Sequence, residues 1–207
     1  MNTRHEYQDL FDLYWPIGVA VFVVIAALVV FVAIRFRSTG DEFPEARDES
    51  RAEYVYAAAL VATAALLLVF TFGTIDDLTS PAAQRARLDV RVTAAKWRWR
   101  FEYAASGTTV QGTDTLAPTL VVPANTPVRF VGTSIDVQHA FWVPALRFKR
   151  DLFPRRSTSF VLVFDDPGFH RGGGECAEFC GLRHANMEFN VDVVSPDQFR
   201  AWLGQRG

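Results

Sequence analysis

The sequence is poor in cysteine: its 207 residues include two, Cys176 and Cys180, which lie four positions apart. A scaffold held together by disulfides needs more cysteines than this, so that class of small extracellular domain is excluded. A single disulfide, half of a zinc site and part of a copper site remain open for the pair. The chain also lacks a C-x-x-C-H motif, which excludes haem attached through that motif, and it shows no internal repeats.

Two long segments lack any ionisable side chain. Residues 15–34 provide twenty such positions in a row and residues 57–75 provide nineteen. Because a helix needs about 20 apolar residues to cross ~30 Å of hydrocarbon, both segments predict transmembrane helices, over about 15–36 and 54–75. A buried core helix is the alternative for each. The first segment is too long for a signal peptide and no small-residue cleavage pattern follows it, so we expect it to stay as an anchor.

Arginine is distributed unevenly around these two segments. The connection between them holds four arginines, the N-terminal flank holds one, and two aspartates follow the second segment. These residues are Arg35, Arg37, Arg47 and Arg51 in the connection, Arg4 before it, and Asp76 and Asp77 after it. Since positive charge stays on the cytoplasmic side, both termini are expected on the outer side of the cell membrane. Residues 1–76 thus predict a two-helix membrane anchor, followed by a linker over 77–86.

From about residue 87 the sequence takes on the pattern of β-strands. Short runs of β-branched and aromatic residues alternate with polar ones, and Gly, Pro, Asn or Asp residues bound them. The expected strands are 119–123, 127–134, 157–164 and 188–194, together with KWRWRFEY, which places Trp97, Trp99, Phe101 and Tyr103 on one side. Such a series predicts an all-β sandwich or barrel over 87–195. Ser195 and Pro196 then predict the N-cap and first position of a short helix within 196–207.

The segment GGGECAEFCGLRHANMEF carries the residues that indicate chemistry. Cys176, Cys180, His184 and Met187 follow at offsets of four, four and three, and His139 lies 37 residues before the first cysteine. Two thiolates, two imidazoles and a thioether form a soft ligand set that suits copper, with methionine as the weak ligand. A disulfide between the cysteines, and a zinc site of two cysteines and two histidines, are the alternatives.

The second cysteine changes the kind of copper site that the pattern predicts. One cysteine with two histidines and a methionine is typical of a mononuclear blue-copper site. Two cysteines four residues apart let both sulfurs bridge two metal ions, each of which then takes one histidine and one weaker ligand. Neither ion needs an open coordination position, so the pattern favours electron transfer over chemistry on a bound substrate.

The run C-A-E-F-C-G-L-R-H-A-N-M resembles the dinuclear copper signature of cytochrome c oxidase subunit II, C-x-E-x-C-G-x-x-H-x-x-M. The two apolar segments, KWRWRFEY and DVQHAFWVPALRFKRDLFP extend the resemblance over essentially the whole chain. It implies a two-helix transmembrane hairpin followed by an all-β, cupredoxin-like Greek-key sandwich with a dinuclear copper A centre. Quinol-oxidising relatives lack the copper ligands, whereas this sequence has all of them.

The resemblance also implies the ligands of the metal ions. Copper would be bound by the side chains of His139, Cys176, Cys180, His184 and Met187, and by the backbone carbonyl of Glu178. The side chain of Glu178 would bind a magnesium or manganese ion at the border with subunit I. A carboxylate exposed to water is the alternative for that side chain.

Two further residues receive roles from the resemblance. Trp97 matches the tryptophan that takes the electron from the donor, with ordinary core packing as the alternative. Glu53 opens the second apolar helix from the cytoplasmic side, where many family members place the mouth of a proton-uptake path into subunit I. An interfacial anchor is the alternative for Glu53.

The function that the resemblance implies is that of a subunit of a terminal oxidase in the lipid bilayer. Electrons from a soluble or tethered cytochrome c or blue-copper protein would pass through the copper centre to haem in subunit I, where oxygen is reduced to water with proton translocation. Subunits I and III are the expected partners, and no nucleic acid is expected. The alternative is a membrane-anchored protein that binds or delivers copper without a catalytic partner.

Two departures from the family pattern lead to further expectations. Residues 85–207 contain 16 Lys and Arg against 12 Asp and Glu, a net charge of +4, and Ile135 stands where relatives often carry an acid beside Asp136. We therefore expect an electron donor that is not strongly basic. The stretch PGFHRGGGEC is longer than usual and rich in glycine, which predicts a long, mobile loop that contains His170 as a solvated side chain.

Overall fold

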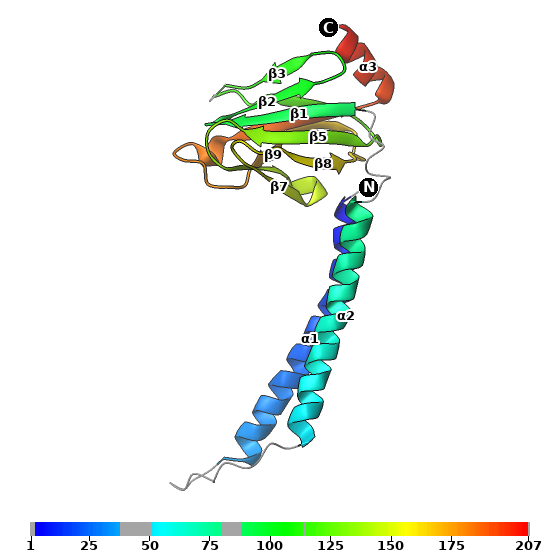
Figure 1. Cartoon of the computed structure of the whole chain (residues 1–207), viewed down its shortest axis with the longest axis vertical. Coiled ribbons are helices and arrows are strands. Elements are labelled where there is room, and N and C mark those ends of the chain that lie inside the picture. The colour runs from blue at the N-terminus through cyan, green and yellow to red at the C-terminus, as the bar shows by residue number, and fades with distance from the viewer. Residues whose placement is uncertain (1–2, 38–50, 80–87, 114, 207) are drawn as a thin grey trace. The chain divides into compact units, whose positions relative to one another are not determined.

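The computed structural model describes residues 3–37, 51–79, 88–113 and 115–206 (Figure 1). The chain divides into two compact units, one formed by residues 8–77 and one that contains all of the strands. Each unit has its own architecture, and the predicted linker falls at the division. Its first residues, up to Thr79, continue a helix, and the remainder lies outside the described residues.

The first unit is a pair of long helices. Helix α1 spans Thr3–Arg35 and α2 spans Arg51–Thr79, so both apolar segments lie within helices that extend beyond them. Both helices are long and apolar enough to cross a membrane. The Tyr14 hydroxyl of α1 donates to the carbonyl oxygen of Leu67 (3.1 Å) and lies 2.7 Å from Thr71 Oγ1, both in α2. These bonds link the two helices where little else is polar.

The second unit is a sandwich of two five-stranded sheets, ordered β3-β2-β1-β5-β8 and β4-β10-β9-β6-β7. Strands β1 and β5 pair in parallel, as do β4 and β10, and the remaining pairs are antiparallel. The strands are β1 Leu88–Ala95, β2 Arg98–Tyr103, β3 Thr109–Gln111, β4 Thr119–Pro123, β5 Val128–Ser134, β6 His139–Val143, β7 Phe148–Leu152, β8 Thr158–Leu162, β9 Gly168–Cys176 and β10 Glu188–Val194. Two short 3-10 turns, η2 Pro144–Leu146 and η3 His184–Asn186, and helix α3, Pro196–Gly204, complete the unit.

Aromatic side chains fill the space between the two sheets. Trp99, Phe101 and Tyr103 of β2 are fully buried, as their alternation predicts. The Phe189 ring of β10 lies 5.5 Å from the Trp99 ring, 5.3 Å from Phe101 and 4.9 Å from Phe141. Trp97 differs from the other three because it precedes β2, in the turn after β1, and is only partly buried. The core therefore ends at Trp99 on this side of the sandwich.

Tyr103 makes two hydrogen bonds to one backbone residue within this core, and their loss should be measurable. Its hydroxyl donates to the Val121 carbonyl oxygen and accepts from the Val121 N–H, each at 2.8 Å. Tyr103→Phe would leave both groups unpaired in the core, which should cost about 1–3 kcal/mol in the free energy of unfolding. Denaturant unfolding followed by tryptophan fluorescence measures this change. Tyr56→Phe removes the same hydroxyl from an exposed side chain and should leave the midpoint unchanged.

The same hydroxyl predicts a dependence of stability on pH. Burial raises the pKa of Tyr103 well above its usual value, against smaller opposing effects of the Val121 hydrogen bond and of Arg206. The folded state then keeps a proton that the unfolded state releases near pH 10, so stability should fall as the pH rises above about 10. The fall should be smaller in Tyr103→Phe.

Candidate metal centre

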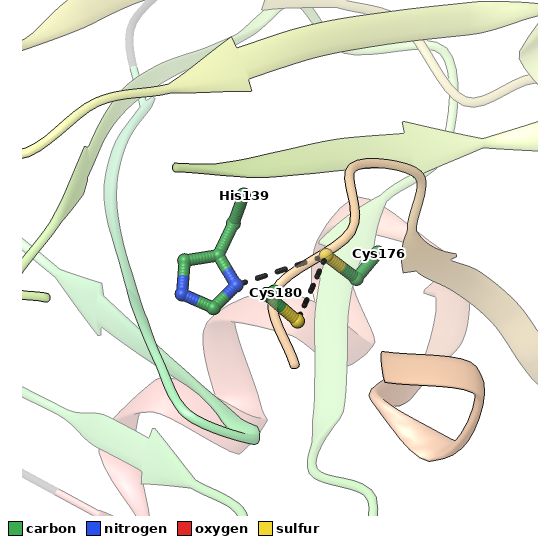
Figure 2. A group of neighbouring side chains, drawn as sticks. All are labelled: His139, Cys176 and Cys180. Carbon is green, nitrogen blue, oxygen red and sulfur yellow. Dashed lines mark hydrogen bonds between the residues drawn. The ribbon is translucent and has the colours of Figure 1, made fainter. Parts of the chain in front are cut away.

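The predicted metal ligands come from two strands and the loop that follows one of them. His139 begins β6 and Cys176 ends β9, and these two strands pair with Phe141 opposite Cys176. Cys180 lies in the loop after β9, His184 begins η3, and Met187 lies just before β10. His139 thus stands at the start of its strand. Figure 2 shows its imidazole directed at the two cysteines.

The two thiols are neighbours, and each has its own imidazole and its own weaker donor. The sulfur atoms of Cys176 and Cys180 lie 3.8 Å apart. Cys176 Sγ lies 3.7 Å from His139 Nδ1 and 3.3 Å from the Glu178 carbonyl oxygen. Cys180 Sγ lies 3.7 Å from His184 Nδ1 and 3.8 Å from Met187 Sδ. The structure therefore brings together all six predicted donor atoms, in two sets of three.

These distances fit two metal ions better than a disulfide. A disulfide needs sulfur atoms about 2.05 Å apart, and both cysteines are free thiols. One metal ion bound to a sulfur at ~2.3 Å and an imidazole nitrogen at ~2.0–2.1 Å holds those atoms about 3.5–3.8 Å apart. Both sulfur–nitrogen distances here, 3.7 Å, fall in that range.

A single zinc ion fits less well. Among the described residues, the ligand atoms of His139, Cys176 and Cys180 all lie within 4.8 Å of one another, but His184 is not part of this group. One tetrahedral ion would need all four donors around a common point. Here His139 Nδ1 lies 3.7 Å from Cys176 Sγ and His184 Nδ1 lies 3.7 Å from Cys180 Sγ, so the two imidazoles approach the sulfur pair at different points, as two metal ions that share both sulfurs require.

The two thiols ionise differently. Burial raises the pKa of Cys176, but hydrogen bonds from His139, backbone groups and His184 outweigh it and lower the value below its usual range. Burial and the charge of Cys176 both raise the pKa of Cys180. The protein alone therefore stabilises one thiolate, and two thiolates side by side require the positive charge of bound metal.

Asp136 holds the His139 ring in place, a role for Asp136 that was not predicted from the sequence. His139 Nε2 lies 2.9 Å from Asp136 Oδ1, while Nδ1 points to Cys176. The backbone N–H groups of Lys96 and Val137 each donate to the Asp136 carboxylate at 2.7 Å. Burial would raise the pKa of Asp136, yet these bonds and His139 lower it to about 2. A carboxylate in this position fixes the tautomer that presents Nδ1 to a metal.

Two tryptophans contact the backbone of the candidate metal-binding loop, residues 177–187, which we call the metal-binding loop. Trp97 Nε1 donates to the carbonyl oxygen of Cys180 (3.3 Å), and Trp99 Nε1 donates to that of Met187 (3.2 Å). A Cβ atom on Gly181, where φ is +116°, would lie 3.3 Å from Trp97 Cζ2. Trp99 is fully buried and Trp97 is partly exposed, so Trp97 lies between the loop and the surface.

The glycine-rich stretch before Cys176 is a strand and not a loop. Residues Gly168–Cys176 form β9, which pairs with β10 and β6, so the expectation of a long mobile loop is wrong. Gly174 lies under the Phe189 ring, where an added Cβ would come within 1.9 Å of Phe189 Cζ. His170 belongs to this strand, with Nε2 3.0 Å from the Asp166 carbonyl oxygen. Close packing of the ring thus accounts for the glycine at 174.

The two remaining predicted residues are Glu178 and Glu53. Glu178 meets the thiols through its backbone alone, and Glu53 lies in another unit of the chain. Glu178 is half-buried in the loop and places its carbonyl oxygen beside Cys176. Glu53 lies in the first turn of α2 and is exposed. The predicted roles of the Glu178 carboxylate and of Glu53 stay predictions.

The chain resembles known proteins along its whole length. The family model described as cytochrome C oxidase subunit II, periplasmic domain, matches residues 112–194. Cytochrome c oxidase subunit 2 of Bacillus sp. (strain PS3) is 33% identical over 148 residues, which are 70% of this chain and 40% of that protein. The chain thus spans less than half the length of this relative. The probable cytochrome c oxidase subunit 2 of Rickettsia bellii is 27% identical over 222 residues, which cover 100% of this chain and 80% of that protein.

A solved structure supports the same assignment. The crystal structure of the periplasmic domain of subunit II of cytochrome oxidase (CoxB) of Bradyrhizobium japonicum matches with a TM-score of 0.53 and 26% identity, over 59% of this chain and 94% of that one. The predicted fold class, a two-helix hairpin with a cupredoxin-like sandwich, is therefore confirmed, and the chain is a membrane protein with a periplasmic-type domain. In these matches and in the arrangement of the site, the chain is similar to the cytochrome c oxidase subunit II family.

Proposed function

We propose that this chain is subunit II of a terminal cytochrome c oxidase and that its thiol pair holds a dinuclear copper centre. The observation that carries the proposal is the pair of sulfur atoms 3.8 Å apart, each with a separate imidazole nitrogen at 3.7 Å. When bound there, copper supplies a one-electron carrier. Held by these residues, it would carry electrons from a donor protein toward haem in subunit I, where oxygen would be reduced to water with proton translocation.

The residues around the site suit it to electron transfer because they hold the donors in place. The Cys176 N–H donates to the Met187 carbonyl oxygen (3.0 Å), which also accepts from Trp99 Nε1. The Ala177 N–H donates to the Ala140 carbonyl oxygen (3.1 Å), which ties the loop to β6. Ligand side chains fixed in this way move little when the charge of the centre changes, and this lowers the barrier to each electron transfer.

A copper-delivery protein without a catalytic partner is the second candidate, and the burial of the site argues against it. Four of the five side-chain donors, His139, Cys176, Cys180 and Met187, are at least 95% buried, and only His184 is partly exposed. Delivery requires ligands that a partner can reach, whereas a permanent centre gains from exclusion of water.

Purification from the membrane under mild conditions separates the two candidates. The oxidase function predicts co-purification with a haem-containing subunit I, and with subunit III, and oxygen consumption with a reduced dye. A chain that retains copper but purifies without haem and without oxygen consumption would support delivery instead. Protease accessibility in right-side-out vesicles tests the orientation, in which both termini lie outside.

The Glu178 carboxylate is proposed as a ligand for magnesium or manganese at the border with subunit I. Hard cations of this kind prefer carboxylate oxygens, and Glu178 lies between the two cysteines. Glu178→Gln should lower the manganese or magnesium content of the complex while both copper ions stay, because copper meets only the carbonyl oxygen of this residue. Metal analysis of the purified complex measures both.

Glu53 is proposed as the opening of a proton-uptake path into subunit I. Glu53→Gln removes a titratable group from the start of α2 and should lower turnover about tenfold or more, with a changed pH profile, since proton relays of this type depend on the carboxylate. Glu53→Asp keeps the carboxylate and should retain most of the activity. Unchanged turnover and pH profile in Glu53→Gln would show that the residue is only an interfacial anchor.

A further inference from the structure

Exposed apolar side chains gather in the loops around the metal centre. Within the described residues from 88 to 206, large hydrophobic side chains that are exposed occur at five positions, Leu116, Ile135, Phe169, Phe179 and Leu182. Phe179 (77% exposed) and Leu182 (91%) flank Cys180 and Gly181 in the metal-binding loop, and Ile135 (67%) precedes Asp136. Side chains of this size at the surface mark a site of interaction when they form one patch.

Contacts along the chain join these residues around Trp97. Its indole donates to the Cys180 carbonyl oxygen and packs beside Gly181, so Phe179 and Leu182 lie in the loop that it contacts. The residue before Trp97, Lys96, donates its N–H to Asp136, and the Ile135 N–H donates to the Ala94 carbonyl oxygen (3.1 Å). These two bonds hold Ile135 next to the turn that carries Trp97. We call the four side chains the docking patch: Trp97, Ile135, Phe179 and Leu182.

Basic side chains dominate the loops that carry the docking patch. Residues 95–98, 134–138, 153–157 and 177–187 contain five basic side chains against two acidic ones. The basic ones are Lys96, Arg98, Arg155, Arg156 and Arg183, and the acidic ones are Asp136 and Glu178. The Asp136 carboxylate already accepts bonds from two backbone N–H groups and lies against His139. Its hydrogen-bonding positions are therefore used within the protein, and with its charge included the basic side chains of these loops still exceed the acidic ones by three.

The arginines next to Ile135 are free to meet an anion. Ile135, Arg155 and Arg156 line one open hollow, with the Arg156 guanidinium 4.0 Å above the Phe153 ring. Arg155 and Arg156 are exposed, as are Lys96 and Arg98 beside Trp97, and within the described part of the chain none of the four makes an ion pair. Such charges steer a partner of opposite sign toward the patch and favour its orientation.

On the basis of the proposed oxidase function, we propose that the docking patch and its basic rim bind a small one-electron carrier protein whose contact face is apolar at the centre and acidic around it. Transient redox partners bury small interfaces, and charge sets their rate of association more than their affinity. The partially exposed Trp97 would lie at the centre of that contact, next to the carbonyl oxygen of a metal-binding cysteine.

The test uses the intact membrane oxidase with two probe donors, one soluble cytochrome c of net negative charge and one that is strongly basic. With the acidic cytochrome, kcat/KM should fall about tenfold or more as the ionic strength rises from about 0.01 M to 1 M, because the Debye length shrinks from ~30 Å to ~3 Å. Arg155→Glu with Arg156→Glu should lower kcat/KM for the acidic cytochrome at low salt about tenfold or more, and raise it for the basic one.

A matched double change provides the control. Arg200→Glu with Arg206→Glu alters the net charge by the same amount in α3 and the turn after it, and α3 follows the end of β10 opposite to the metal-binding loop (Figure 1). At an ionic strength of about 0.1 M, where the Debye length is ~10 Å, this variant should leave both donors unaffected to within about twofold, because charges farther than this from the docking patch are largely screened. Oxygen consumption with a small reduced dye should be equal in all three proteins.

The outcomes separate the two proposals. Faster reaction with the basic cytochrome at low salt, or no effect of the Arg155 and Arg156 changes, would overturn the acidic partner while oxidase turnover with the dye continued. Absence of turnover with the dye in the unmodified complex would overturn the oxidase function, and this inference with it.

Discussion

Cys180→Ser is expected to abolish the dinuclear copper centre and all turnover that depends on a protein donor. The Cys180 sulfur lies within 3.8 Å of Cys176 Sγ, His184 Nδ1 and Met187 Sδ, so it contacts three of the predicted donors, including the other sulfur. A serine hydroxyl is a hard donor that cannot bridge two soft copper ions. Copper should fall from two ions per chain to one or none, as metal analysis and the visible spectrum would show.

Met187→Leu is the matched control for this prediction. It removes a weak ligand while keeping an apolar side chain of similar size in a buried position. Both copper ions should remain, with a shifted reduction potential, because the weak ligand tunes the potential of such a site. A Cys180→Ser protein that kept the spectrum and copper content of the parent would show that the two sulfurs do not share the metal.

Trp97→Leu should slow electron transfer from a protein donor about 30-fold or more. Trp97 is the partly exposed ring in contact with the metal-binding loop, and a tryptophan at the centre of an interface commonly contributes at least ~2 kcal/mol. Leucine keeps an apolar surface but loses the ring and its hydrogen bond to the Cys180 carbonyl oxygen. Stopped-flow reduction of the oxidase by a reduced donor measures the rate.

A second variant and a second electron donor distinguish the possible causes of a slower reaction in Trp97→Leu. Phe179→Leu alters another exposed ring of the same patch without touching the bond to Cys180, so its effect should be several-fold smaller. Turnover with a small reduced dye should change little in Trp97→Leu, because the dye does not need the protein docking site. Equal losses in both variants would mean that Trp97 serves in docking and not as the receiver of the electron.

The metal-binding loop could be predicted from the sequence because its information is local. Five of the six predicted ligands lie within twelve residues, from Cys176 to Met187, and the types and spacing of their side chains indicate two metal ions. The strands also follow from local alternation, and Trp99, Phe101 and Tyr103 fill the core as expected.

The features of the site that could not be predicted from the sequence depend on strand pairing. His139 reaches Cys176 because β6 pairs with β9 in one register, and nothing in either segment specifies that register. Asp136 was not assigned its role because its partners, a histidine three residues on and the N–H of Lys96 forty residues before, meet only in the folded chain. The D-x-x-H spacing was the one available signal.

The strand formed by the glycine run before Cys176 could not be predicted for a different reason. Glycine suggests a flexible loop, yet here it is needed because the Phe189 ring of the neighbouring strand occupies the place of a side chain at Gly174. Local composition cannot distinguish conformational freedom from close packing against a residue fifteen positions away in the sequence.

The measurement that tests the central claim most directly is the metal content and electron paramagnetic resonance spectrum of the copper-loaded protein. The arrangement of two thiols with separate imidazoles predicts two copper ions per chain and, in the partly reduced state, one unpaired electron shared equally between two copper nuclei. A single copper ion with its electron on one nucleus, or a tightly bound zinc ion in its place, would contradict the account.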